Sequence, residues 1–197
     1  MQRAVWAGVA VVLVCSLAGC ASAPKSVGKG STMFDQLQQR ANEITSKGGL
    51  AAVGLGTSET MALAIDKAKT RGRTELAHVM ETKVDSLKKD FQEEIGEGSG
   101  AELNTLFSAA SKSIAHQILR GSVPKDVKFE TEGKSTTAVA LMVQDPKVIK
   151  EALDQQKNTA AAVYTRFRAS QAFKELDDEC KKYEEFKQKD MGGAIAQ

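Results

Sequence analysis

The sequence predicts an α+β domain with a small sheet of about three strands packed against two long helices, followed by a long C-terminal amphipathic helix. Three patterns predict it. A short apolar run lies between glycines at Leu50–Leu55, apolar residues recur every three or four positions over 61–95, and the period changes to two over 127–143. The chain has 197 residues, which favours one domain with a modest core.

Residues 1–19 are predicted to be a signal peptide that ends in a lipobox, Leu17-Ala18-Gly19-Cys20. Arg3 supplies the positive charge, residues 4–16 form the apolar segment, and small residues stand beside the expected cut between Gly19 and Cys20. A permanent membrane-spanning helix needs about 20 apolar residues, and this run is shorter. A short anchor or a buried helix is the alternative interpretation.

Cys20 is the predicted lipidation site, bearing a diacylglycerol on its thiol and an acyl chain such as palmitate on the freed amine. Each buried methylene contributes about 0.8 kcal/mol, so two or three chains make a stable anchor. Asp at the next position favours inner-membrane retention in proteobacterial lipoproteins. By resemblance to lipoproteins generally, Ala21 therefore predicts the outer membrane, with the domain on its periplasmic face.

The charge and cysteine content bound the partners of the mature chain. Removing residues 1–19 takes away only Arg3, so the formal net charge falls from +2 to +1. Near-neutral charge and 5% aromatic residues argue against a nucleic-acid partner. Of the 3 cysteines, Cys15 leaves with the signal peptide and Cys20 is lipidated. Cys180 remains, either as a passive helix residue or as an intermolecular link.

The first elements follow from turn and capping signals. Residues 20–31 are predicted to be the lipidated Cys20 and a short flexible tether, because the segment is small, polar and rich in glycine. A helix is expected from Met33 to Lys47, capped by Thr32 and stopped by two glycines. Leu50–Leu55 is the first strand, and Thr57 or Ser58 is expected to cap the next helix.

Glycines Gly54 and Gly56 do not predict a nucleotide-binding loop. The third glycine of that motif is missing, Glu59 would repel a phosphate, and no Gly-Lys-Ser/Thr run occurs. The glycines instead indicate a tight turn from strand to helix. The helix over 61–95 carries small residues in its first half, at Ala64, Ala68 and Gly72, which would allow a sheet to approach closely.

A second long helix is expected from about Gly100 to Arg120, opened by a Ser99–Glu102 capping box and paired antiparallel with the end of the preceding helix. The 2 histidines, His78 and His116, have no second ligand at metal-binding spacing. No metal site is predicted. Lysines and arginines near residue 70 alternate with acids, which is typical of a solvated face.

A hairpin and a long helical segment complete the chain. Apolar and polar residues alternate over 127–132, which predicts a strand with one face toward solvent, and Gly133-Lys134 makes the turn. Residues 137–143 are apolar on both faces, which predicts a central strand paired with Leu50–Leu55. The domain is thus expected over 32–145. Asp145-Pro146 opens a helical region, and 146–197 is predicted to be the C-terminal long helix and a disordered tail. That helix either packs against the Met33–Lys47 helix or projects for self-association or partner binding.

No pattern predicts catalysis. The sequence shows no nucleophile with a base, no paired carboxylates and no cofactor motif, so catalytic, metal and cofactor-binding residues are all predicted to be absent. The expected role is that of a lipid-anchored outer-membrane lipoprotein with a structural or protein-interaction function in the cell envelope. The alternatives are a carrier of small ligands or lipids, with a groove over the sheet beneath the alanine-rich helix, and a flagellar outer-membrane assembly component.

The core from about Gly49 to Asp145 resembles the Lpp-twenty family of membrane-associated twenty-kilodalton lipoproteins. The resemblance lies in the run from Ala52 to Ser58, the alanines that follow it, the Arg73-Thr74-Glu75-Leu76-Ala77 segment and the hairpin strand from Thr136 to Val143. It covers about half of the chain. It implies a lipid anchor, a small strand-helix-hairpin domain and a role in envelope structure or flagellar outer-membrane assemblies, and it brings no catalytic residues.

Overall fold

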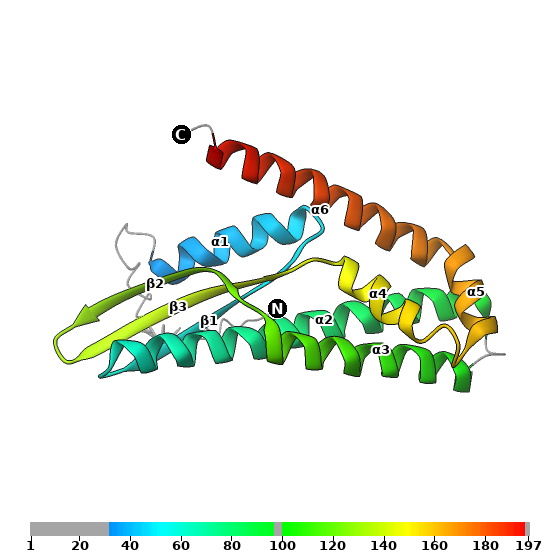
Figure 1. The fold of residues 1–197 in the computed structure, drawn as a ribbon, viewed down its shortest axis with the longest axis horizontal. Helices are drawn as coiled ribbons and strands as arrows, with labels where there is room; N and C mark the ends of the chain where they lie inside the picture. Colours follow the sequence, from blue (N-terminus) through cyan, green and yellow to red (C-terminus); the bar gives the residue numbers. More distant parts are fainter. Residues whose placement is uncertain (1–31, 97–99, 196–197) are drawn as a thin grey trace, which may run out of the picture. The chain divides into compact units, whose positions relative to one another are not determined.

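The computed structural model describes residues 32–96 and 100–195, which form an α+β fold of helices around one antiparallel sheet (Figure 1). The predicted signal peptide over 1–19, the tether over 20–31, cleavage and lipidation at Gly19 and Cys20, and Ser99 of the capping box lie outside the described residues. The predicted fold class is confirmed. The elements, in chain order, are α1 (Met33–Ser46), β1 (Leu50–Ser58), α2 (Met61–Ile95), α3 (Gly100–Gly121), β2 (Pro124–Glu132), β3 (Ser135–Gln144), α4 (Lys147–Gln155), α5 (Ala161–Ala169) and α6 (Gln171–Ile195).

The sheet has the strand order β1-β3-β2, with both pairs antiparallel. The predicted hairpin and central strand are therefore confirmed. Gly54 pairs with Ala140 across β1 and β3, and Phe129 pairs with Ala138 across β2 and β3. Gly133 in the hairpin turn has φ 58°, a left-handed conformation that side-chain-bearing residues adopt only with strain.

The two faces of the sheet are covered by different helices, because successive side chains of a strand point to opposite sides. Odd-numbered residues of β1 and β3 pack with α1, in a cluster of Leu37, Ala41, Ile44, Ala51, Val139, Leu141 and Tyr183. Even-numbered residues pack with the first half of α2, in a cluster of Ala64, Ala68, Ala138 and Ala140. In Figure 1, α1 lies on one side of the strands and α2 on the other.

Small residues bring α2 against the sheet, as predicted. A Cβ atom added to Gly54 would lie 2.2 Å from the carbonyl oxygen of Ala68 and 2.2 Å from the amide nitrogen of Gly72. A Cβ at Gly56 would lie 2.3 Å from the carbonyl oxygen of Ala64. Backbone therefore touches backbone along this face, so the groove that the carrier alternative required beneath the alanine-rich helix is closed.

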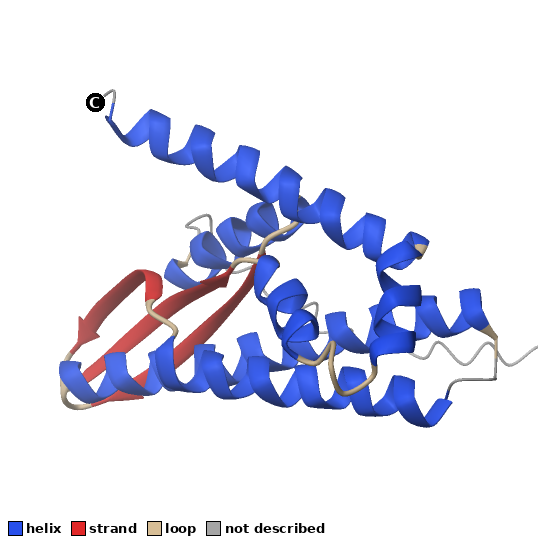
Figure 2. Cartoon of the chain, turned by 45° about the vertical axis from the view of Figure 1, so that its right-hand side comes forward, coloured by secondary structure: helices blue, strands red, loops and turns tan. Residues whose placement is uncertain are grey.

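The larger core lies beyond the sheet, where the second half of α2 pairs with α3 and the later helices close over them (Figure 2). Phe91, Phe107 and Phe167 are almost fully buried, and their ring centroids are 5.3–6.5 Å apart. Such tilted and edge-to-face ring pairs add to the free energy of burial. The expected pairing of α2 with α3 is confirmed by this cluster.

Two boundaries differ from the predictions. The prediction of Thr57 or Ser58 as the cap of α2 is wrong, because β1 continues to Ser58, which pairs with Thr136, and Thr60 is the residue before α2. The region after Pro146 forms three helices where one continuous helical segment was expected. The chain turns at residues 156–160 and again at Ser170.

Side chains cap the second of these breaks, with neither glycine nor proline present. The Ser170 hydroxyl accepts a hydrogen bond from the amide of Phe173 at 3.1 Å. The Glu94 carboxylate, from the end of α2, accepts hydrogen bonds from the amides of Gln171 and Ala172, each at 2.9 Å. These hydrogen bonds satisfy the free N–H groups at the start of α6. The Glu94 bonds form only because the fold brings the end of α2 next to α6.

Helix α6 packs against its own domain, which is the first of the two predicted arrangements. Tyr183 joins the α1 cluster, and Leu176 and Cys180 join the larger core. The Gly48–Gly49 turn fits beneath α6 so closely that a Cβ at Gly48 would lie 2.6 Å from the Glu179 carbonyl oxygen. Ion pairs surround these contacts: Lys83–Glu179, Lys147–Glu184, Lys150–Asp177, Lys187–Asp145, Arg40–Asp190 and Lys125–Asp190.

Candidate functional site

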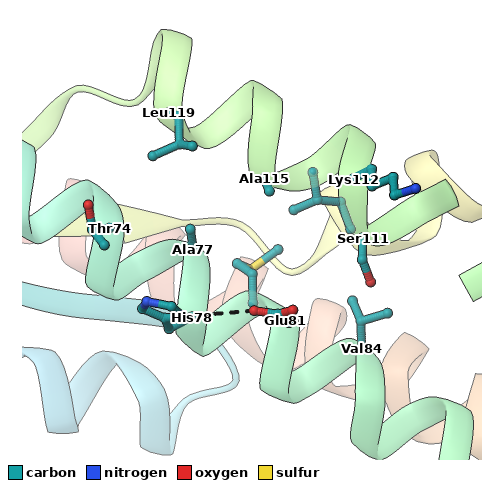
Figure 3. Close-up of a pocket in the computed structure, with 11 residues that line it drawn as sticks. Thr74, Ala77, His78, Glu81, Val84, Ser111, Lys112, Ala115 and Leu119 are labelled. Carbon is teal, nitrogen blue, oxygen red and sulfur yellow. Dashed lines mark ion pairs between the residues drawn. The ribbon is translucent and has the colours of Figure 1, made fainter. Parts of the chain in front are cut away.

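The candidate site is a groove between α2 and α3, with a volume of about 310 Å³ (Figure 3). We call it the α2–α3 groove. The two helices contribute alternating turns to its walls, and no other element lines it. Its lining residues are Thr74, Ala77, His78, Met80, Glu81 and Val84 from α2, and Ser111, Lys112, Ile114, Ala115 and Leu119 from α3.

The groove forms where the helix pair changes from large to small side chains. Near Phe91 and Phe107 the aromatic rings fill the space between α2 and α3. Toward the sheet, Ala77 and Ala115 take their place and leave the space open. Met80, Val84 and Ile114 form an apolar floor, each no more than 1% exposed.

The rim is apolar at one end and charged at the other. Leu119 is 53% exposed at the apolar end. His78 and Glu81 stand on the α2 side, with 3.8 Å between Nδ1 of His78 and Oε2 of Glu81. Lys112 stands on the α3 side. The lining thus includes an anionic residue of α2 and a cationic residue of α3 beside the apolar floor.

The groove holds residue types that catalytic sites use, but their geometry is that of a surface. A nucleophile such as Ser111 would need a base held at hydrogen-bonding distance and oriented by a third group. The side chains of His78 and Glu81 are 67% and 65% exposed, and the distance between them exceeds that of a hydrogen bond. Within the described residues, every buried side-chain nitrogen and oxygen has a partner. The arrangement is suited to binding an apolar surface.

The groove continues toward the far ends of the two helices. A shallower extension of about 210 Å³ is lined by Glu81, Asp85, Lys88, Phe107, Ser108, Ser111 and Lys112. Phe107 is the only apolar residue of this extension, so its walls are mainly charged. A molecule lying along both parts would meet an apolar half and a charged half.

The structure places the other predicted residues as follows. His78 lies on the rim of the groove, while His116 is exposed on α3. The part of the chain that the structure describes contains no group of three His, Cys, Asp or Glu side chains able to hold a metal ion. Among residues 32–96 and 100–195, no helix combines the length and apolar character needed to cross a membrane.

Cys180 is buried at 3% exposure and has no disulfide partner in the described chain. Burial among apolar neighbours raises the pKa of its thiol to about 11, because the thiolate would lose its hydration. The folded protein therefore keeps Cys180 protonated and out of reach of a second chain. This geometry fits the passive interpretation.

Sequence reasoning missed the α2–α3 groove. Leu119 was the available signal, because this apolar residue lies off the helical stripe of Ile114 and Ile118. The space beneath Leu119 depends on the axial offset of two helices, which the sequence pattern does not give. Compared with protein-family models and with curated proteins, the chain matches none.

Proposed function

We propose that this protein is a lipid-anchored outer-membrane lipoprotein that binds a protein partner of the cell envelope, without catalysing a reaction. The signal-peptide pattern over 1–19 and Cys20 support the anchor. The α2–α3 groove supports the partner. The observation that carries the proposal is that this groove is apolar and open, whereas the apolar side chains of α6 from Ala172 to Phe186 are buried or partly buried in their own domain.

The partner that suits the groove is an amphipathic helix. Two antiparallel helices present parallel ridges, and a third helix can pack its own ridge between them as in a three-helix bundle. An apolar stripe on the partner would cover Ala77, Ala115 and Leu119. Flanking charges of opposite sign would face Glu81 and Lys112, which fixes the orientation of the partner more than its affinity.

Site-specific photocrosslinking in cells tests this role. We expect a crosslinker at Ala115 to capture a defined envelope protein, and Leu119→Glu to abolish the captured band because it puts a charge in the groove. Leu63→Glu is the matched control, since Leu63 is 49% exposed on α2 and lines none of the described grooves. Loss of the band in both variants, or in neither, would contradict docking in the groove.

The anchor has a separate test. Cys20→Ala removes the thiol that would receive the lipid, so we expect the unprocessed precursor or a protein released into the aqueous phase on detergent partitioning. The wild-type chain is expected in the outer-membrane fraction. A Cys20→Ala protein that partitions and fractionates like the wild type would refute lipidation.

A carrier of an acyl chain is the second candidate, because the floor of the same groove is apolar. Lys112 at the rim would then face the carboxylate of a fatty acid. Native mass spectrometry of the protein after detergent removal would show a bound lipid mass that Leu119→Glu removes. A role in flagellar assembly and membership of the Lpp-twenty family stay predictions of the resemblance.

A further inference from the structure

The two edges of the sheet are protected to different degrees. The edge strand β2 carries five charged residues and begins with a proline, Pro124, features that prevent another strand from adding to an edge. The edge strand β1, Leu50–Ser58, has no charged residue and no proline. An edge of this kind is a template for a further strand.

Basic side chains protect only the far half of β1. Nη1 of Arg71 donates to the carbonyl of Leu55 at 2.8 Å, and Nζ of Lys67 donates to the carbonyl of Thr57 at 3.1 Å. These two carbonyls point away from β3. Because the backbone N–H and C=O groups of alternate residues in an antiparallel strand point to the same side, the groups of the other odd-numbered residues of β1 also point outward, away from β3. The outward N–H and C=O groups of Ala51 and Val53 have no such donor or acceptor among the described residues.

These two residues form the floor of a slot of about 680 Å³ between α1 and α2. Phe34 and Gln38 of α1 form one wall, and α2 forms the other. Phe34 and Leu55 leave 38% and 39% of their surface exposed on the same side of the strand. The complete lining is Phe34, Gln38, Ala51, Ala52, Val53, Gly54, Leu55, Arg71, Thr74, Glu75 and Val79.

We propose that this β1 slot binds an extended segment of a partner polypeptide, which adds a fourth strand beside Ala51 and Val53. Only a peptide backbone supplies the alternating donors and acceptors that the outward groups need, so an acyl chain would leave them unsatisfied. Direct pairing of the β1 edges of two copies of the chain is excluded by shape, because both edges are recessed between helices.

The walls of the slot define the segment further. One of its side chains lies over the exposed surfaces of Phe34 and Leu55 and is apolar. Glu75, an exposed residue of the α2 wall, favours a lysine or arginine beside the strand. The Arg71 contact with Leu55 ends the pairing, so the strand is short. This site shares the α2 residue Thr74 with the α2–α3 groove but has its own floor in β1, and the experiments below test it independently of the groove.

A short synthetic peptide of alternating threonine and valine, with a lysine at each end, is the probe. We expect it to bind the full chain in detergent and to slow hydrogen exchange at the amides of Ala51 and Val53, while the amide of Gly54, already bonded to β3, is unchanged. The same peptide with alternate amides N-methylated keeps its side chains but loses strand donors. It is expected to bind at least about ten-fold more weakly.

Val53→Pro removes one outward donor and leaves the sheet bonds of β1 in place, because proline is tolerated at an edge position facing solvent. We expect about ten-fold weaker peptide binding for this variant, with Val53→Thr as the matched control that keeps the N–H. Circular dichroism verifies that both variants fold.

Equal binding of the N-methylated peptide, equal binding by Val53→Pro, or no binding by the wild type would overturn the proposal. Strong protection of the Val53 amide in the free chain would overturn it as well. In that case protection that rises with protein concentration identifies a second copy as the occupant, and constant protection identifies a segment of the same chain.

Discussion

Gly54→Ala is the sharpest test of how β1 and α2 are held together. The new Cβ would lie 2.2 Å from the Ala68 carbonyl oxygen, whereas ordinary contacts begin at 3.4 Å. The three nearest atoms are all backbone atoms of α2, so no side chain can rotate to relieve the contact. The strand and helix must separate by roughly 1 Å, an overpacking that costs up to about 3 kcal/mol.

The separation also loosens the contacts of Ala64, Ala68, Ala138 and Ala140, which exist only at the close approach. The measurement is urea unfolding followed by circular dichroism. For a chain of this size, 3 kcal/mol corresponds to a fall in Tm of about 6–12 °C. Gly100→Ala is the matched control, because a Cβ at Gly100 meets nothing within 4 Å. A Gly54→Ala protein within about 0.5 kcal/mol of the wild type would refute the reasoning.

Three further predictions concern α6. Lys150 and Lys181 lower the pKa of Asp177 to about 2, from 3.8, so the stability that this carboxylate contributes is present above pH 3.8 and is lost as the pH falls toward 2. Asp177→Asn is therefore expected to reduce the difference between the urea midpoints at pH 5 and pH 2.5. An unchanged difference would count against a stabilising role of these ion pairs. Glu94→Ala removes the acceptor of two amide hydrogen bonds at the start of α6 and is expected to lower the free energy of unfolding by about 1 kcal/mol, measured by urea unfolding. The control Glu93→Ala is expected to change it very little, because Glu93 pairs with exposed Lys89 at 4.0 Å. Equal losses in the two variants would contradict the capping role of Glu94. Cys180 is expected to react with a thiol reagent at pH 8 only as fast as the protein unfolds, given its burial and raised pKa, and rapid labelling of the folded protein would disprove that protection.

The proposed binding surfaces follow from which apolar surfaces the fold leaves open. The tyrosine and phenylalanine of α6, Tyr183 and Phe186, stack against each other and join the cluster of α1. These two side chains of the helix that was expected to project thus pack inside the domain. Open apolar surface remains at the α2–α3 groove and at the β1 slot, which α2 lines together with α3 in the first case and with α1 and β1 in the second.

The elements with strong local signals were predictable from the sequence. The Thr32 side chain and the Asp35 carboxylate form a complete capping box at the start of α1. The change of period at residue 127 marked the hairpin, and the Asp145 side chain accepts a hydrogen bond from the amide of Lys147, as its position before Pro146 indicated. Each of these signals involves residues that are close together in the sequence, so it can be recognised from the sequence alone.

The breaks after Pro146 were not predictable in this way. No glycine or proline stands between Lys147 and Lys189. Ser170 ends one helix and Glu94, from α2, begins the next by accepting its free amides. A residue 77 positions away supplies the cap, and sequence spacing does not reveal such a partner.

The sequence by itself determined the identity of most elements, because the caps and the apolar periods are local. The lipid anchor and the outer-membrane location stay predictions of the sequence. Tertiary structure alone decided that α6 packs on its own domain, that the alanine-rich face closes against the sheet, and that the α2–α3 groove and the β1 slot stay open. The physical reason is that a surface stays open only where no distant element covers it, and coverage is a property of the packed chain.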